Sequence, residues 1–198
     1  SWLGPHGFEM WADLADPGYQ WDPTLPSFVG VDVSLRWDTT AVCAVQRRHD
    51  GDRWHARAWI FRTSDGRAVD LAPVRSVILN DIGTVSACAY DPRYFEASAQ
   101  DLAEAGVNMI EVPQTQQRMV PAIGGLYRWI TTGQLSHDGA PDFASQVVNA
   151  VRRETDAGFT LSKLRSELKI DAAIALALAV SIADPNPYQP SDDAFKIW

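Results

Sequence analysis

The sequence predicts an α/β fold built on a β-sheet of mixed direction, with three antiparallel strands followed by parallel strands and flanking helices. The stretches 28–35, 39–48 and 54–62 are rich in β-branched and apolar residues and are separated by polar turns, as in an antiparallel meander. After residue 70, segments with helical periodicity alternate with short apolar runs, which is typical of parallel strands joined by helices.

The elements follow this order along the chain. The residues His-Asp-Gly-Asp at 49–52 indicate a tight turn between the second and third strands. Apolar residues three or four apart predict a helix over 70–81, and the run VSACAY predicts a strand over 85–90. A helix is expected from Pro92 to about Ala105, where a glycine follows.

The second half continues the alternation. We expect a short strand over 107–112 and helices over 114–131 and 141–154, each with an apolar stripe. The last predicted helix, from Asp171 to about Ile182, is apolar on all sides, so it should be buried.

Length and composition limit the possible functions. The 198 residues suffice for one good core, and no apolar run reaches the roughly 20 residues needed to cross a bilayer, so no membrane partner is expected. A net charge of −8 argues against a dedicated, tight nucleic-acid binder, but not against an enzyme that meets nucleic acid through metal ions. Cys43 and Cys88 lie in strand-like runs, which fits a reducing, intracellular setting.

Composition also suggests how the chain divides. Residues 1–27 hold four prolines and three tryptophans and are expected to form an irregular arm that packs against another part of the protein. Residues 28–183 carry the predicted domain, and residues 184–198, rich in Pro and Asp, are expected to form a tail.

Four aspartates stand out. Asp32 lies inside an apolar strand, where an unpaired charge costs several kcal/mol. Asp91 precedes a proline and Asp171 opens the buried helix, so each could simply cap a helix. Asp38, in the turn RWDTT, could be an ordinary turn residue.

Considered together, three of these residues predict a metal site. The first strand and the strand over 85–90 can lie side by side, and the buried helix can bring its first residue against both. Asp32, Asp91 and Asp171 would then converge, and like charges packed together recruit a cation. Such ligands suit two Mg²⁺ or Mn²⁺ ions about 4 Å apart, which promote phosphodiester hydrolysis by water. Asp32 would contact both ions, with Asp91 on one side and Asp171 on the other.

The segments VGVDVSLRWDTTAVCAV, ACAYDPRYFE and KIDAAIALALAV, in this order, resemble the nuclease domain of the large terminase subunit of tailed bacteriophages, a member of the ribonuclease-H-like superfamily. The intervening residues 112–151 are also similar, in a Gln-Thr segment, a Gly-x-Leu-x-His step and a helix ending near Asn149. The resemblance spans about residues 28–183.

The resemblance implies a ribonuclease-H-like fold in which Asp32, Asp91 and Asp171 form the metal-binding acidic triad, with Asp38 as an additional acidic residue near it. It implies an endonuclease that cuts concatemeric viral double-stranded DNA during genome packaging in the host cytoplasm. It also implies partners: the portal, the small terminase subunit and an ATP-driven motor domain on the N-terminal side, from which residues 1–27 would lead. The chain has no G-x-x-x-x-G-K-[ST] phosphate loop, so we expect it to cut DNA but not to translocate it.

Two basic residues are candidates for accessory roles. Some related resolvases place a histidine one turn before the final aspartate; Leu168 occupies that spacing here, which leaves Lys169 as the candidate to assist the leaving group. His137 could approach the metals or the DNA. The other basic residues form no dense run, so we expect weak, salt-sensitive and largely sequence-independent DNA binding.

Three alternatives remain. An actin-like kinase fold has a similar first phosphate-binding turn, but it needs a second such turn and a much longer chain. Another ribonuclease-H-like enzyme, of resolvase or transposase type, would use the same acidic residues. A metal-free docking module of the packaging machine would keep the fold, and the acidic pI and the tryptophan-rich arm suit protein binding.

Overall fold

The computed structural model describes residues 1–33, 39–62, 69–165 and 168–187. Within them, six strands form one sheet in the order β5-β4-β1-β2-β3-β6, and two further strands form a separate hairpin. The strands are β1 (Ser27–Asp32), β2 (Thr39–Arg47), β3 (Trp54–Arg62), β4 (Val85–Tyr90), β5 (Met109–Glu111), β6 (Leu135–His137), β7 (Ala150–Thr155) and β8 (Gly158–Lys163). The helices are α1 (Gly7–Ala12), α2 (Ala72–Ser76) with its π-helical continuation η1 (Val77–Asp81), α3 (Pro92–Glu104), α4 (Gln116–Thr131), α5 (Pro141–Val148) and α6 (Asp171–Ala183).

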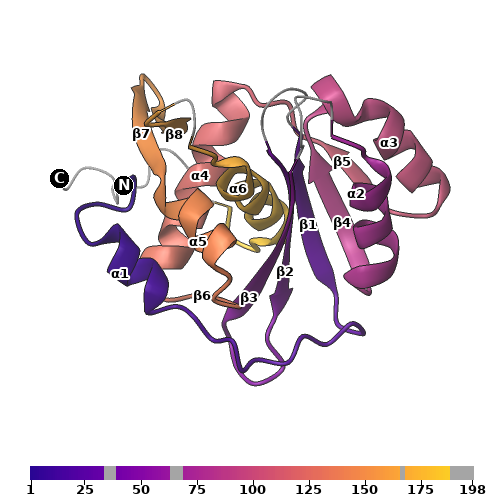
Figure 1. Ribbon diagram of the computed structural model, residues 1–198, viewed down its shortest axis with the longest axis horizontal. Helices are drawn as coiled ribbons and strands as arrows, with labels where there is room; N and C mark the ends of the chain where they lie inside the picture. The colour runs from indigo at the N-terminus through magenta and orange to yellow at the C-terminus, as the bar shows by residue number, and fades with distance from the viewer. Residues whose placement is uncertain (34–38, 63–68, 166–167, 188–198) are drawn as a thin grey trace.

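The sheet is mixed, as predicted. Strands β1, β2 and β3 are antiparallel neighbours, whereas β4 runs parallel to β1, β5 parallel to β4 and β6 parallel to β3. Helices α4, α5 and α6 cover one face of the sheet, and α2 and α3 cover the other (Figure 1). Each face has its own hydrophobic core. The predicted fold class is therefore confirmed.

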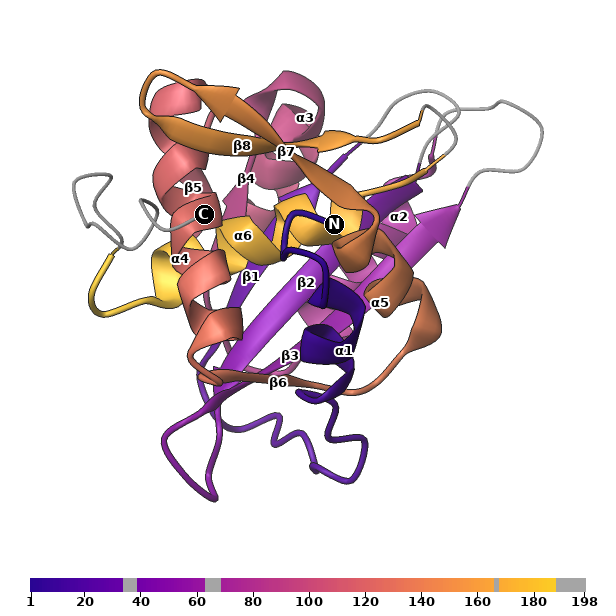
Figure 2. The same cartoon turned by 90° about the vertical axis from the view of Figure 1, so that its left-hand side faces the viewer.

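The predicted helix over 141–154 is wrong beyond Val148. Helix α5 ends there, and the chain turns into the β7–β8 hairpin, which lies above α6 in Figure 2. Valines 147 and 151 are four residues apart, which fits a helix, but Thr155 and Gly158 pair across a two-residue turn. Gly158 has φ 138°, a conformation that favours glycine.

The N-terminal segment contains helix α1 and packs into the core. Trp2 and Trp11 are each 1% exposed. The Trp2 indole donates to the carbonyl of Val147 at 2.8 Å, and Trp11 stacks on His137 with ring centroids 4.1 Å apart. Neither α1 nor the three-residue strand β6 was predicted from the sequence. The division of the chain at residues 28 and 184 stays a prediction.

Helix α6 crosses strands β1 and β2 and forms the centre of one core. Every residue of this helix except Ser181 and Ile182 is buried, as its all-round apolar sequence predicts. Its backbone lies directly against β1, because a Cβ atom added to Gly30 would stand 2.0 Å from the carbonyl oxygen of Ala175. Only glycine fits at this position.

Among the residues that the structure describes, no helix is both long enough and apolar enough to traverse a lipid bilayer.

Changing Gly30 to Ala should destabilise the protein by about 3 kcal/mol or more, because overpacking against rigid backbone costs at least as much as overpacking against movable side chains. The measurement is denaturant unfolding followed by circular dichroism. Gly51→Ala is the matched control, since nothing lies within 4 Å of a Cβ atom there. Equal unfolding free energies for the two variants would contradict the close contact.

Candidate active site

The sheet brings two of the predicted acidic residues to the same edge. Strands β1 and β4 are parallel neighbours, and Val31 pairs with Tyr90. Asp32 is the last residue of β1, and Asp91 directly follows β4, so both lie where the strands end. Ligand sites in α/β proteins commonly form at this carboxyl edge of parallel strands.

Helix α6 brings the third acidic residue to the same region. Asp171 is the first residue of the helix and is 5% exposed. The Thr39 hydroxyl, from the start of β2, donates a hydrogen bond of 2.5 Å to Asp171 Oδ2. Asp171 is thus buried between the helix and the antiparallel part of the sheet, and the helix N-terminus favours its negative charge.

Asp32 is buried and strongly perturbed by its surroundings. It is 9% exposed, and its Oδ1 accepts a hydrogen bond of 2.6 Å from the Gln114 side-chain amide. Burial, the main cause, raises the pKa of Asp32 to about 7, and the charges of Asp171 and Asp91 add to this effect. The hydrogen bond from Gln114 and the charge of Lys163 act in the opposite direction.

Asp91 is less buried and has a capping role. Its Oδ1 accepts a hydrogen bond of 3.0 Å from the backbone N–H of Arg93, at the start of α3. The simple interpretation of Asp91 as a helix cap is therefore correct for its present hydrogen bond, although its charge still acts on Asp32.

The donor set fits a hard divalent cation. Asp32 and Asp171 supply only oxygen donors, and the raised pKa of Asp32 reflects negative charge that a cation would neutralise. Within the described part of the chain, however, no three His, Cys, Asp or Glu side chains are grouped closely enough to hold one ion. The electrostatic link is strongest between Asp32 and Asp171, and the three-acid metal site stays a prediction.

The structure does not bring His137 to this region. His137 lies on the edge strand β6 and pairs with Ala56 of β3. Asp32 lies on the central strand β1 and pairs with Ala41 of β2. The Nε2 of His137 donates to the carbonyl of Trp11 at 2.8 Å, and its Nδ1 accepts from the backbone of Gly139 at 3.1 Å. Burial lowers the pKa of His137. His137 therefore holds the N-terminal segment in place.

The remaining candidates give a mixed result. Asp38 lies outside the described residues. Lys169 is half-buried two residues before Asp171, and its accessory role stays a prediction. The structure adds Lys163, whose charge lowers the pKa of Asp32, and Gln114, which binds Asp32 directly. The Gln-Thr pair at 114–115 was visible in the sequence, but nothing local indicated which residue it would contact.

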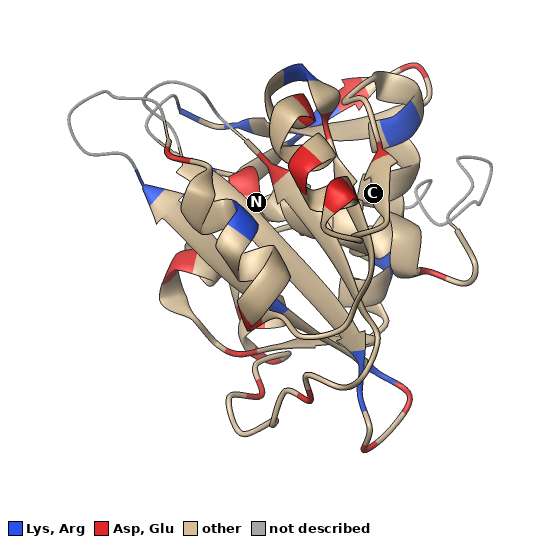
Figure 3. Ribbon diagram, turned by 90° about the vertical axis from the view of Figure 1, so that its right-hand side faces the viewer, with Lys and Arg blue, Asp and Glu red and all other residues tan. Residues whose placement is uncertain are grey.

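Among the residues that the structure describes, the basic side chains do not gather in one block. In Figure 3 the basic positions (blue) are spread over the ribbon among acidic ones (red). Several arginines are engaged with acidic side chains, such as Arg48 with Asp16 and Asp50, each at 2.7 Å. This distribution agrees with the expectation of a surface without a dense basic run.

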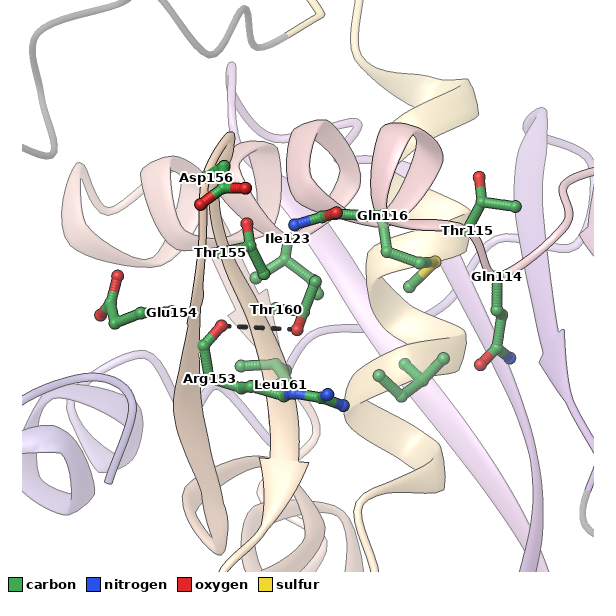
Figure 4. A pocket seen from close by; sticks show the side chains of 12 residues that line it. Gln114, Thr115, Gln116, Ile123, Arg153, Glu154, Thr155, Asp156, Thr160 and Leu161 are labelled. Carbon is green, nitrogen blue, oxygen red and sulfur yellow. Dashed lines mark hydrogen bonds between the residues drawn. The ribbon is translucent and has the colours of Figure 1, made fainter.

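A polar pocket of about 510 Å³ opens beside Gln114, the residue that binds Asp32. The start of α4, the β7–β8 hairpin and Ile174 of α6 line it. Gln114 lines this pocket and also binds Asp32, so the two sites share a residue. Figure 4 shows Arg153 extending from β7 toward α6. The pocket is therefore linked to Asp32 through Gln114 and contains a basic side chain, Arg153.

A family model described as the endonuclease domain of the terminase large subunit matches residues 47–185. The chain belongs to this family. The matched range includes Asp91 and Asp171 but begins after Asp32. The predicted family is thus confirmed, and the family match covers residues 47–185, against a predicted range of 28–183.

Solved terminase structures share the fold. The HK97 bacteriophage large terminase superposes with a TM-score of 0.71 and 21% identity, over 88% of this chain and 42% of that one. The large terminase nuclease from thermophilic phage G20c with bound magnesium superposes with a TM-score of 0.64 and 17% identity, over 88% and 94%. Protein YmfN of Escherichia coli K12 is 29% identical over 129 residues, which are 63% of this chain and 28% of YmfN. This chain thus spans less than half of the HK97 large terminase and less than half of YmfN.

Replacing Asp32 with Asn should change the pH dependence of stability. Because the folded pKa of Asp32 is about 7, against 3.8 ordinarily, protonated Asp32 stabilises the fold at low pH, and this stability is lost as pH rises through 7. In chelator, the two proteins should be about equally stable only below about pH 4, and the difference in their unfolding free energies should grow as pH rises from about 4 to 7. At pH 8 the Asn variant should be more stable, by at most about 4 kcal/mol. Urea unfolding of both proteins across this pH range tests the prediction. A difference in unfolding free energy that does not change with pH would contradict it.

Proposed function

We propose that this domain is a divalent-metal-dependent endonuclease that cuts concatemeric viral double-stranded DNA during genome packaging. The observation that supports it best is the buried, mutually repelling pair Asp32 and Asp171 at the carboxyl edge of the sheet, with Asp91 directly after β4. Family membership favours this reading over a resolvase, a transposase or an actin-like kinase.

The acidic residues would hold Mg²⁺ or Mn²⁺ at two positions. Asp32 would bind both ions, Asp171 would bind one of them and Asp91 the other. To do so, Asp91 must release its hydrogen bond from the Arg93 N–H or bind the ion while keeping it. Bound ions of this kind would activate water and stabilise the leaving oxygen of a phosphodiester. Burial of Asp32 and Asp171 limits competing water and strengthens their interaction with a cation.

Neighbouring residues would orient the acids and the DNA. Gln114 donates to one oxygen of Asp32 and so restricts its rotation. Lys163 offsets part of the negative charge around Asp32. Arg153, at the edge of the adjoining pocket, is placed to contact a DNA phosphate, and such contacts position a duplex without reading its sequence. We therefore infer weak, salt-dependent binding to double-stranded DNA.

The wider assembly follows from the family. This chain corresponds to 42% of the HK97 large terminase, which leaves room in a full-length protein for another domain. We infer that an ATPase motor precedes the nuclease, that the portal and the small terminase subunit are its partners and that it acts in the host cytoplasm.

Asp32→Asn should reduce nicking of supercoiled plasmid in Mn²⁺ or Mg²⁺ by more than about 100-fold, since loss of mere outer-shell partners already costs 10–100-fold. Gel analysis across a metal series, with a chelator arm, measures this. Asp13→Asn is the matched control, because Asp13 is exposed at the end of α1. Cleavage by Asp32→Asn at the parental rate would refute the site assignment. If the parental chain binds DNA but does not cleave it at any metal concentration, the result would instead favour a docking module.

A further inference from the structure

Three hydrogen bonds at the start of helix α6 form a ring, which the peptide bond between Asp171 and Ala172 closes. Its side chains are Thr39 from β2, Gln146 from α5 and Asp171, which are 4%, 3% and 5% exposed. The fourth member is the backbone N–H of Ala172. Burying this much polar surface is unfavourable unless every group is paired, so the ring demands an explanation.

The polarity of the ring is determined by the backbone. The N–H of Ala172 can only donate, and it donates to Gln146 Oε1 at 2.8 Å. The other end of the Gln146 amide is therefore its NH₂ group, which donates to Thr39 Oγ1 at 3.2 Å. The Thr39 hydroxyl then directs its proton to Asp171 Oδ2. Asp171 is thereby held as a hydrogen-bond acceptor.

The ring also replaces a missing helix cap. Ile170 precedes α6 and offers no side-chain cap. Gln146 supplies the acceptor that a capping residue would otherwise provide, from a different helix. One glutamine therefore connects the position of α6 to the orientation of its first carboxylate.

We propose that Thr39 and Gln146 are positioning residues that hold the Asp171 carboxylate in the orientation in which it binds a divalent cation. Fixing one carboxylate oxygen through Thr39 also fixes the direction of the other. This inference rests on the proposed nuclease function, and it assigns to two neutral residues the preorganisation of the metal site.

The chain contains an internal control for Thr39. Thr40 is the next residue of β2 and is 0% exposed, and its hydroxyl has no hydrogen-bond partner among the described residues. Successive strand residues point to opposite faces, so Thr40 lies on the face that carries Val42, away from α6. Thr39→Val and Thr40→Val remove the same hydroxyl from adjacent buried positions, and only the first should affect the metal.

The test measures Mn²⁺ binding by isothermal titration calorimetry together with plasmid nicking. Thr39→Val should weaken Mn²⁺ binding about 10–100-fold. Thr40→Val should bind as the parental chain does. Nicking by Thr39→Val should fall at low Mn²⁺ and recover at saturating Mn²⁺, with the KM for DNA unchanged, because no DNA contact is lost.

Two further variants separate positioning from folding. Thr39→Ser keeps the hydroxyl but loses the methyl group, so its Mn²⁺ affinity should stay within about 3-fold of the parental value even where its thermal stability falls. Gln146→Met should weaken Mn²⁺ binding, and the double variant with Thr39→Val should lose less affinity than the two single losses added together, because part of the effect of Gln146 passes through Thr39.

The outcomes distinguish this inference from the proposed function. If the parental chain cleaves DNA but Thr39→Val binds Mn²⁺ as tightly as Thr40→Val, the positioning role is wrong and the nuclease function stands. Loss of Mn²⁺ affinity in Thr39→Ser equal to that in Thr39→Val would also overturn the positioning role. Absence of both Mn²⁺ binding and cleavage in the parental chain would overturn both proposals.

Discussion

The contact between helix α6 and strand β1 at Gly30 is the constraint on which the rest of the structure depends. The helix can lie against the strand backbone only because position 30 has no side chain and because the helix itself is rich in alanine. This contact places the first turn of α6 beside the carboxyl end of β1, so Asp171 reaches the surroundings of Asp32. A helix displaced outward by one methyl group would separate these two carboxylates. Packing in the core and charge at the site are therefore two results of one close approach.

The acidic site opposes the stability of the domain that carries it. Burial and repulsion both disfavour the ionised form of Asp32, and protein atoms relieve this only in part, through Gln114 and Lys163. Asp171 instead accepts a hydrogen bond from Thr39, which is itself held by Gln146. One carboxylate is thus destabilised and the other firmly held. Such a pair suits a function in which a cation arrives at a prepared ligand and relieves strain at its neighbour.

The sequence predicted the sheet and the burial of helix α6 because their signals are local. An aspartate within a strand of valines and an alanine-rich helix that is apolar all round are unusual in themselves, and both proved to be buried. The partners of these residues were not predictable, because Gln114 meets Asp32 from 82 residues away and Gln146 meets Thr39 from 107 residues away. The β7–β8 hairpin was missed because its first valine continues a helical spacing. Strand β6 is too short to show any alternation.

Trp2 and Trp11 extend the cooperative folding unit beyond the six-stranded sheet. Both rings fill space beneath α4 and α5, and the backbone of Asp16 is hydrogen-bonded to the carbonyl of His137. Excising the domain at the start of β1 would leave two tryptophan-sized voids and expose the underside of α5, the helix that carries Gln146. Fragments intended for crystallisation or assay should accordingly retain the first 26 residues, even though no candidate ligand lies among them.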